Sequence, residues 1–111
     1  MKLVVVVDSF IAVVDKLLKA RSPTGGKFFV ETKGGRYLNF KPKQFKIVLG
    51  DVVGKDSLKS CLVYYKRLGF IVVDEENRFT NIQWIKKKSQ RVITVDKEVY
   101  ETLKELRKEG D

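Results

Sequence analysis

The stretch LKSCLVYYKRLGFIVVDEENRFTNIQW (residues 58–84) decides the fold, because its first part predicts a helix and the remainder predicts strands. Asp56 or Ser57 supplies an N-cap oxygen for this helix. The apolar residues that recur at helical spacing and predict a buried stripe are Leu58, Cys61, Leu62, Tyr65 and Leu68. The opposite side of the same helix is polar and basic, so we expect it to face solvent.

The helix is expected to end at Gly69, which favours the left-handed backbone of a helix C-terminus. Phe70 stands where a Schellman ending places its hydrophobic contact, so the chain should turn directly into a strand. Residues 70–73 and 79–85 are rich in β-forming side chains. The polar residues 74–78 between them have the length of a hairpin loop, so the sequence predicts that these two strands pair with each other.

The N-terminal segment predicts a second helix. Residues 3–7 are a short apolar run that fits either a strand or the buried start of a helix. Asp8 or Ser9 can then cap a helix over residues 8–21. The apolar residues that follow at helical spacing are Phe10, Val13, Val14, Leu17 and Leu18.

A hairpin is predicted in KFFVETKGGRYLNFK (residues 27–41), because Gly34 and Gly35 accept the positive φ angles of a tight turn. Pairing Lys33 with Arg36 sets the register and places Phe29 opposite Phe40. One face would then carry Phe29, Glu31, Leu38 and Phe40. The other, mixed face would carry Phe28, Val30, Thr32, Tyr37, Asn39 and Lys41.

Residues 42–49 fit two structures. Pro42 suits a first helical turn, and Phe45 and Leu49 are spaced as in a helix, whereas Phe45, Ile47 and Leu49 also alternate as in a strand. We favour the helix. Residues 91–95 predict a further short strand, and Asp96 is expected to cap a final helix.

Together these elements predict a small α+β domain with β-hairpins and a C-terminal helix. The segments YYKRLGFIVV and NRFTNIQWIKKK, with residues 8–21 and 42–49 before them, resemble a winged helix-turn-helix domain over residues 8–88. In that family the second helix of the pair enters the DNA major groove. The resemblance therefore implies a winged-helix-like domain in residues 1–91 and a strand-helix association segment in residues 92–111.

The same resemblance implies which residues contact DNA. On the helix they are Lys55, Lys59, Ser60, Lys66 and Arg67. Two features depart from the family pattern: residues 50–55 form a longer link than its tight turn, and residues 74–76 make the expected hairpin tip acidic. Backbone contacts are therefore assigned to the cations after the tip, which are Arg78, Lys86, Lys87, Lys88 and Arg91.

Two shorter resemblances point to other surfaces. KFFVETKGGRYLNFK is similar to strands of PUR-like and coactivator-like sheet proteins that hold single-stranded nucleic acid. This similarity implies a binding face formed by Lys27, Phe28, Lys33, Arg36, Tyr37, Lys41 and Lys43. QRVITVDKEVYETLKELRKEG resembles the opening strand and helix of a ribbon-helix-helix antitoxin. That similarity implies a homodimer formed through Val99, Tyr100, Leu103 and Leu106.

Charge supports a polyanionic partner. The chain carries a formal charge of +9, and residues 16–46 hold nine basic residues against the single acid Glu31. Nucleic acid is the commonest partner of such a surface, although a Lys-rich surface also fits a protein that is simply soluble. Abundant Lys, Glu and Val fit a thermophile. With no bilayer-length apolar run and no signal-peptide pattern, we expect a cytoplasmic protein.

Composition excludes several chemistries. The sequence has no histidine and only one cysteine, Cys61, which removes intrachain disulfides, Cys/His zinc sites and His-based catalytic triads. LVVVVD (residues 3–8) resembles the start of a PIN-type nuclease metal site, but the spacing of Asp15, Asp51 and Asp56 gives no reason for them to converge with Asp8. We therefore expect no enzyme activity, no metal and no cofactor, and an inert Cys61.

The sequence thus favours a non-enzymatic DNA-binding regulator or architectural protein of winged-helix type. A sequence-tolerant binder of single-stranded DNA or RNA, using the hairpin of residues 27–41, is the first alternative. A protein-interaction module whose charge is incidental is the second.

Overall fold

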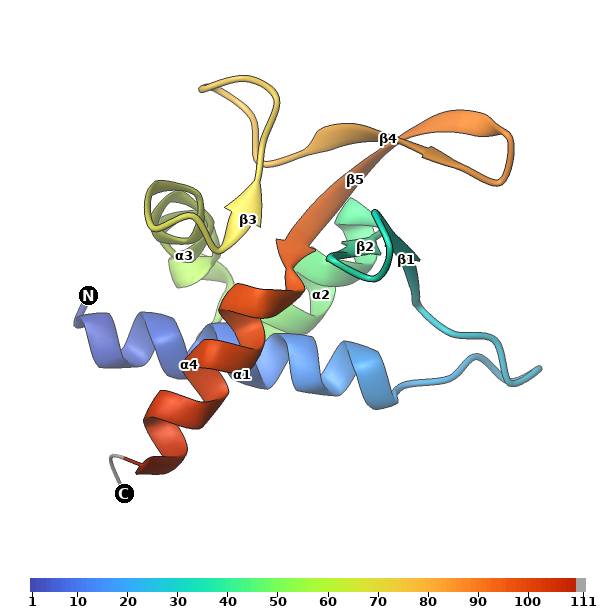
Figure 1. Ribbon diagram of the computed structural model, residues 1–111. Helices are drawn as coiled ribbons and strands as arrows, with labels where there is room; N and C mark the ends of the chain where they lie inside the picture. Colours follow the sequence, from blue (N-terminus) through green and yellow to red (C-terminus); the bar gives the residue numbers. More distant parts are fainter. Residues whose placement is uncertain (110–111) are drawn as a thin grey trace.

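The structure, a computed structural model, describes residues 1–109 and is an α+β domain, as the sequence predicts. Its helices are α1 (Leu3–Lys19), α2 (Pro42–Val53), α3 (Lys55–Arg67) and α4 (Lys97–Glu109). Its strands are β1 (Phe29–Thr32), β2 (Tyr37–Phe40), β3 (Ile71–Val72), β4 (Asn81–Ile85) and β5 (Lys88–Asp96). α1, α2 and α3 pack together, and α2 and α4 contact β5 of the sheet (Figure 1). No helix in the described part of the chain combines the length and apolarity needed to cross a bilayer.

α1 starts earlier than the sequence suggested. The helix begins at Leu3, so the expected cap at Asp8 or Ser9 is wrong and the strand alternative for residues 3–7 is excluded. Val6 is fully buried and extends the stripe of Phe10 by one helical turn. The helix start itself is not buried, because Leu3 is 61% exposed. Burial of Val6 against the core therefore determines the helical state of this β-branched run, despite its local strand propensity.

α2 is the helix that we favoured for residues 42–49, with Phe45 and Leu49 fully buried. It continues through Gly50 to Val53, so the expected long link between the helices is wrong. Gly54 alone separates α2 from α3. Its φ of 86° and ψ of 151° lie in a region that only glycine adopts readily, which explains how two helices can follow each other without a loop.

α3 presents its apolar stripe to the core as predicted, with Cys61, Leu62 and Tyr65 buried. Leu68 is an exception, because it lies beyond the helix and is 44% exposed. The Schellman ending is confirmed: the Phe70 amide donates to the Tyr65 carbonyl at 2.8 Å, and the two rings lie 6.1 Å apart. This ending directs the chain from α3 straight into β3.

All strand pairs of the described sheet are antiparallel, in the order β1-β2-β5-β3, with β4 also paired to β5. The predicted hairpin of residues 27–41 is confirmed in register, because Phe29 pairs with Phe40 and their ring centroids are 6.4 Å apart. Gly34 and Gly35 have the expected positive φ, and Lys33 shares it.

The predicted pairing of residues 70–73 with 79–85 is wrong. β3 and β4 each pair with β5 instead, at Val95 and Thr94 for β3 and at residues 88–92 for β4. β5 is longer than the short strand expected, so it can hold two partners one after the other along its length. Residues 73–80 form the loop between them (Figure 1).

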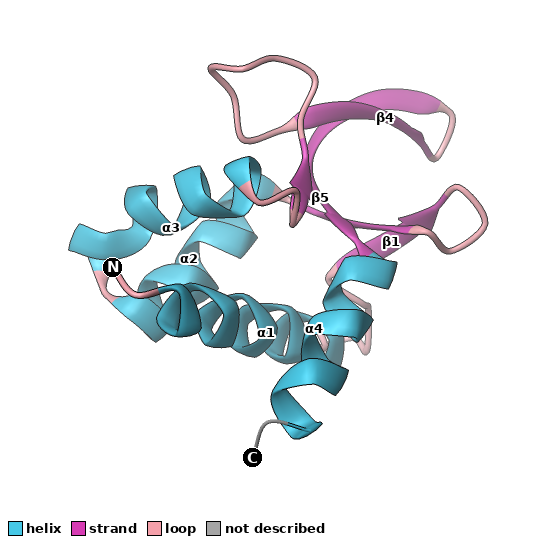
Figure 2. Cartoon of the chain, turned by 60° about the vertical axis from the view of Figure 1, so that its left-hand side comes forward, coloured by secondary structure: helices cyan, strands magenta, loops and turns pink. Residues whose placement is uncertain are grey.

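The β4–β5 ribbon curls back over the β1–β2 hairpin (Figure 2). A buried polar network holds this curl: Thr94 Oγ1 donates to Asn39 Oδ1 at 2.7 Å, and Asn81 Nδ2 donates to Thr94 Oγ1 at 2.6 Å. Thr32 and Gln83 join β1 to β4 through a 3.2 Å hydrogen bond. These bonds connect strands that lie far apart in the sequence.

The C-terminal helix, α4, packs against α1. Asp96 caps α4 as predicted, because its carboxylate accepts from the Glu98 amide at 3.0 Å. Tyr100 donates to Asp15 of α1, and Arg107 Nε donates to Asp8 at 2.7 Å. The domain boundary proposed between residues 91 and 92 falls inside β5, the strand that pairs with β2, β3 and β4.

Candidate nucleic-acid interface

The outer side of α3 carries exposed cations. Four of the predicted contact residues on this helix are exposed, and we call them the α3 face: Lys55, Lys59, Ser60 and Arg67. Lys66 differs from them, because its ammonium donates to the Glu76 carbonyl and lies 5.1 Å from the centroid of the Phe79 ring. The structure therefore brings most of the predicted helix residues to one exposed surface, while Lys66 holds the neighbouring loop.

The acids of that loop lie beside two arginines. Asp74 accepts from Arg91 at 3.4 Å, and Glu75 pairs with Arg78 at 3.2 Å. Both pairs are partly exposed, so each contributes little to stability. Their main effect is on the local field, because two of the three acids in residues 74–76 are largely offset by a neighbouring cation. The predicted backbone contacts Arg78 and Arg91 are therefore engaged with these acids.

The turn between β4 and β5 is basic. Lys86 and Lys87 form it, with φ of 53° and 66°, and Lys88 begins β5. A two-residue hairpin turn with both φ angles positive favours Asn-Gly, so lysine at both positions is locally unfavourable. The hairpin that projects from the domain thus ends in lysines and not in the acids of residues 74–76.

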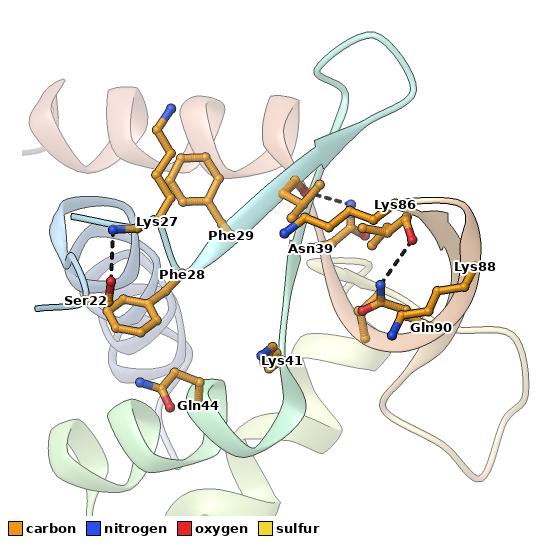
Figure 3. Close-up of a pocket in the computed structure, with 14 residues that line it drawn as sticks. Ser22, Lys27, Phe28, Phe29, Asn39, Lys41, Gln44, Lys86, Lys88 and Gln90 are labelled. Atoms are coloured by element: carbon orange, nitrogen blue, oxygen red, sulfur yellow. Dashed lines mark hydrogen bonds between the residues drawn. The ribbon is translucent and has the colours of Figure 1, made fainter. Parts of the chain in front are cut away.

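A groove of about 500 Å³ lies between the two hairpins, and it is called the lysine groove below. Figure 3 shows Phe28 and Gln44 on one side of this space, Lys86, Lys88 and Gln90 on the other, and Lys41 between them. The remaining lining residues are Ser22, Gly26, Lys27, Phe29, Val30, Asn39, Ile85 and Val92. The described residues that line the groove include four lysines and no acid.

The hydrogen bonds within the walls keep the groove in shape. Gln90 Nε2 donates to the Ile85 carbonyl at 3.1 Å, and the buried Asn39 Nδ2 donates to the Val30 carbonyl at 2.9 Å. The Gly26 amide donates to Ser22 Oγ at 2.9 Å. The lysine side chains remain exposed above this bonded frame.

Only part of the predicted single-strand surface lies in the groove. Lys27, Phe28 and Lys41 line it, whereas the other predicted members, Lys33, Arg36, Tyr37 and Lys43, are not among its described lining residues. Arg36 forms an ion pair with Asp96 at 3.1 Å, and this bond raises the pKa of its guanidinium. Two cations of the predicted surface, Lys27 and Lys41, therefore line the groove, whereas Arg36 is engaged with Asp96.

The predicted association residues lie along α4. Tyr100 is 5% exposed, and Val99 and Leu103 pack partly against the core. Burial raises the pKa of Tyr100, and the hydrogen bond to Asp15 acts in the same direction. Leu106 is 57% exposed. Most of this apolar edge is thus used to dock α4 on α1 and the sheet.

Two of the acids considered for a nuclease site, Asp8 and Asp15, are engaged with side chains of α4. Asp8 binds Arg107, and Asp15 accepts from Tyr100 and from Lys104 Nζ at 3.1 Å. Across residues 1–109, no three His, Cys, Asp or Glu side chains gather as a metal-binding group would. Cys61 is fully buried.

Sequence reasoning missed the amide side chains of the groove, Gln44 and Gln90, and the exposed side of β4. Their elements are far apart in the chain, so no local pattern brings them together. Ile82 and Trp84 are 52% and 69% exposed, alternating with the buried Asn81 and Ile85. The alternation of β4 groups Ile82 with Trp84 on one face, but it would have assigned this apolar face to the core, so the sequence carries no signal that it points outward.

Searches of protein-family models and of curated proteins found no match to this sequence.

Proposed function

We propose that the protein binds duplex DNA as a winged helix-turn-helix domain, with α3 as the recognition helix and the β4–β5 hairpin as the wing. The observation that carries this proposal is the α2–α3 pair, joined by Gly54 alone and packed on α1 so that the α3 face points away from the core. A helix held in this way can enter a major groove while the rest of the domain contacts the backbone.

The residues of the α3 face suit that role. Arg67 can donate two parallel hydrogen bonds to a guanine edge, and Lys59 can bond a guanine or neutralise a phosphate. Ser60 is small enough to allow close approach of the helix. Lys86 and Lys87 at the hairpin turn would contact the phosphate backbone, which is the usual task of a basic wing.

The loop of residues 73–80 is compatible with DNA nearby. Arg78 and Arg91 lie next to Glu75 and Asp74, so the loop repels phosphate less than its acids alone would suggest. Glu76 has its carbonyl bonded to Lys66, which holds the loop against the end of α3. A regulator or an architectural protein would both use such a surface.

The proposal is tested by titrating a labelled duplex, and the single strand of the same sequence, at about 50 and about 200 mM salt. The variant combines Lys59→Glu with Arg67→Glu; it avoids Lys66, whose ammonium has a structural contact. A matched control combines Lys16→Glu with Lys108→Glu, which changes net charge equally on exposed positions of α1 and α4.

We expect the α3 variant to bind the duplex roughly 60-fold more weakly near 0.1 M salt, because the loss of two cations from the DNA surface reduces counterion release and removes about 1.8 from the salt slope. The control should stay within about threefold of the unaltered protein, since distant charges are screened. Equal losses in both variants would contradict the proposal, and absence of binding to either nucleic acid would favour the protein-interaction alternative.

A further inference from the structure

The lysine groove is a separate feature from the α3 face. It is built by β1, β2, the β4–β5 hairpin and the start of α2, and α3 contributes no residue to its described lining. Its volume of about 500 Å³ lies in the range of ligand-binding clefts. A function for α3 therefore leaves the groove unexplained.

The charge of the groove selects an anion. Lys27, Lys41, Lys86 and Lys88 are all exposed and line the same space. The single acid of the β1–β2 hairpin, Glu31, is absent from the described lining and pairs with Lys97 at 3.7 Å. The lysines therefore keep their attraction for phosphate, with no acid among the described lining residues to offset it.

The start of α2 adds to this field. Lys41 precedes the helix, none of the side chains in residues 1–109 caps it, and its first turn contains no acid. The free amides and the positive end of the helix dipole at this point favour an anion. Gln44, in the first turn of the helix, lines the groove as well.

An aromatic ring makes the site more specific than a phosphate cradle. Phe28 is only partly buried and faces the space beside Gln44 (Figure 3). Rings in a basic cleft serve as stacking surfaces for bases, and amide side chains such as Gln44 can bond the base edges. Neighbouring base pairs cover both faces of a base inside a duplex. Only an unpaired base can therefore stack on Phe28.

We propose that the lysine groove binds a single-stranded segment of nucleic acid, with phosphates along Lys27, Lys41, Lys86 and Lys88 and one base stacked on Phe28. The groove accommodates on the order of one or two nucleotides, and its lysines at both rims continue the track for the backbone. This binding site goes beyond the duplex contact assigned to α3 and does not depend on it.

The test measures fluorescence anisotropy of a labelled oligothymidine and of a duplex. The groove variant combines Lys27→Glu with Lys41→Glu, both exposed positions that the duplex proposal does not use. The variant of Lys59→Glu with Arg67→Glu serves as its matched control, because it makes the same charge change on α3. Thermal unfolding of each variant establishes that the domain is folded.

We expect the groove variant to bind oligothymidine about 25-fold more weakly near 0.1 M salt, since two lost contacts to a single strand remove about 1.4 from the salt slope. The α3 variant should retain most oligothymidine binding. Phe28→Ala should weaken it by about tenfold through lost stacking. Thymidine monophosphate, added as a competitor, should displace the strand only at far higher concentration.

Three results would overturn the groove proposal: unchanged oligothymidine binding in the groove variant, an equal loss in the α3 variant, or displacement by thymidine monophosphate as efficient as by unlabelled strand. The duplex proposal is tested separately, by the effect of the α3 variant on duplex binding. Loss of oligothymidine binding only in the groove variant supports the groove even where the α3 variant leaves duplex binding unchanged.

Discussion

The α3 face and the lysine groove are both basic, but their cations have different surroundings. The α3 face lies on one convex helix, and the loop holding Asp74, Glu75 and Glu76 contacts the end of that helix through Lys66. The groove is concave, joins two hairpins and the start of α2, and has no acid among its described lining residues. A convex helix fits the wide major groove, whereas a concave cleft with a ring fits an unpaired strand.

The comparison shows that net charge alone does not identify a partner. Both surfaces attract phosphate, so both would bind nucleic acid weakly in a simple assay at low salt. Shape and the accessible ring distinguish them. Lys86 belongs to both surfaces, because it lies at the hairpin turn assigned to the duplex and also lines the groove. Substitutions elsewhere should change one surface, or the stability of the whole domain, and so separate the two activities.

The largest effect is expected at the β4–β5 turn. Replacing Lys86 and Lys87 by Asn and Gly should raise the free energy of unfolding by about 1 kcal/mol, because both positions have positive φ. Duplex affinity should nevertheless fall roughly 60-fold near 0.1 M salt through two lost phosphate contacts. Thermal unfolding and duplex titration measure the two quantities. A variant that is more stable and binds duplex as well as the unaltered protein would show that the hairpin is not part of the duplex interface.

The junction between α2 and α3 is the next target. Gly54→Ala should lower the free energy of unfolding by about 1–3 kcal/mol, because its φ of 86° strains any other residue. Gly50→Ala is the matched control: its Cβ would lie 3.6 Å from Leu58 Cδ1, an ordinary contact, and alanine suits a helix interior. The control should gain about 0.5–1 kcal/mol. Denaturant unfolding distinguishes them, and equal stability of the two variants would disprove the strained junction.

Asp96 ends β5 just before α4 and belongs neither to the α3 face nor to the described lining of the groove. Although burial opposes it, bonds from Arg36 and from the first amides of α4 lower the pKa of Asp96. Its stabilising contribution is therefore present at neutral pH and is lost as pH falls through the folded-state pKa. Asp96→Ala should reduce stability by about 1 kcal/mol at pH 7, and by less in acid.

Asp96→Asn keeps a side-chain oxygen that can cap α4, so it should lose less stability than the alanine variant. Unfolding curves from neutral to acidic pH measure both variants. The ratio of duplex to single-strand affinity should stay constant in each, and a changed ratio would mean that Asp96 affects one surface directly.

The smallest effect is expected at the acidic loop. Glu76→Gln removes one negative charge near the end of α3 while leaving the backbone carbonyl that binds Lys66. Duplex affinity should rise by about two- to fivefold at low salt and by less at high salt, because the field at an exposed position is screened. Oligothymidine affinity should not change. A rise for both probes would show that the two surfaces share one field.

Local patterns predicted the elements whose own side chains determine them. The stripe of Cys61, Leu62 and Tyr65 and the ending at Gly69 and Phe70 were confirmed, because helix periodicity and C-terminal geometry depend on neighbours in sequence. The α+β class and the register of the hairpin in residues 27–41 were predicted for the same reason.

Elements that depend on distant partners were predicted less well. The polar residues 74–78 look like a hairpin loop, whereas Lys86 and Lys87 give no turn signal although they form the actual turn. Pairing of β3 and β4 with β5 is decided by the length of β5 and by the bond between Asn81 and Thr94. No local pattern contains that information.

The candidate sites follow the same rule. The α3 face was predictable because Lys59, Ser60 and Arg67 share one side of one helix. The groove was predicted only in part, because Lys27, Phe28 and Lys41 meet Lys88 and Gln90 only after the β4–β5 ribbon curls over the sheet. Its amide side chains come from segments that carry no shared motif.

The central claim, that α3 and the β4–β5 hairpin contact duplex DNA, is tested most directly by a two-dimensional amide NMR titration with a short duplex. We predict that signals of Lys59, Ser60, Arg67 and Lys87, none of which lines the lysine groove, shift together as duplex is added, while those of exposed residues on the outer side of α4, such as Glu101, stay in place. Shifts confined to the lysine groove, or to α4, would contradict the claim.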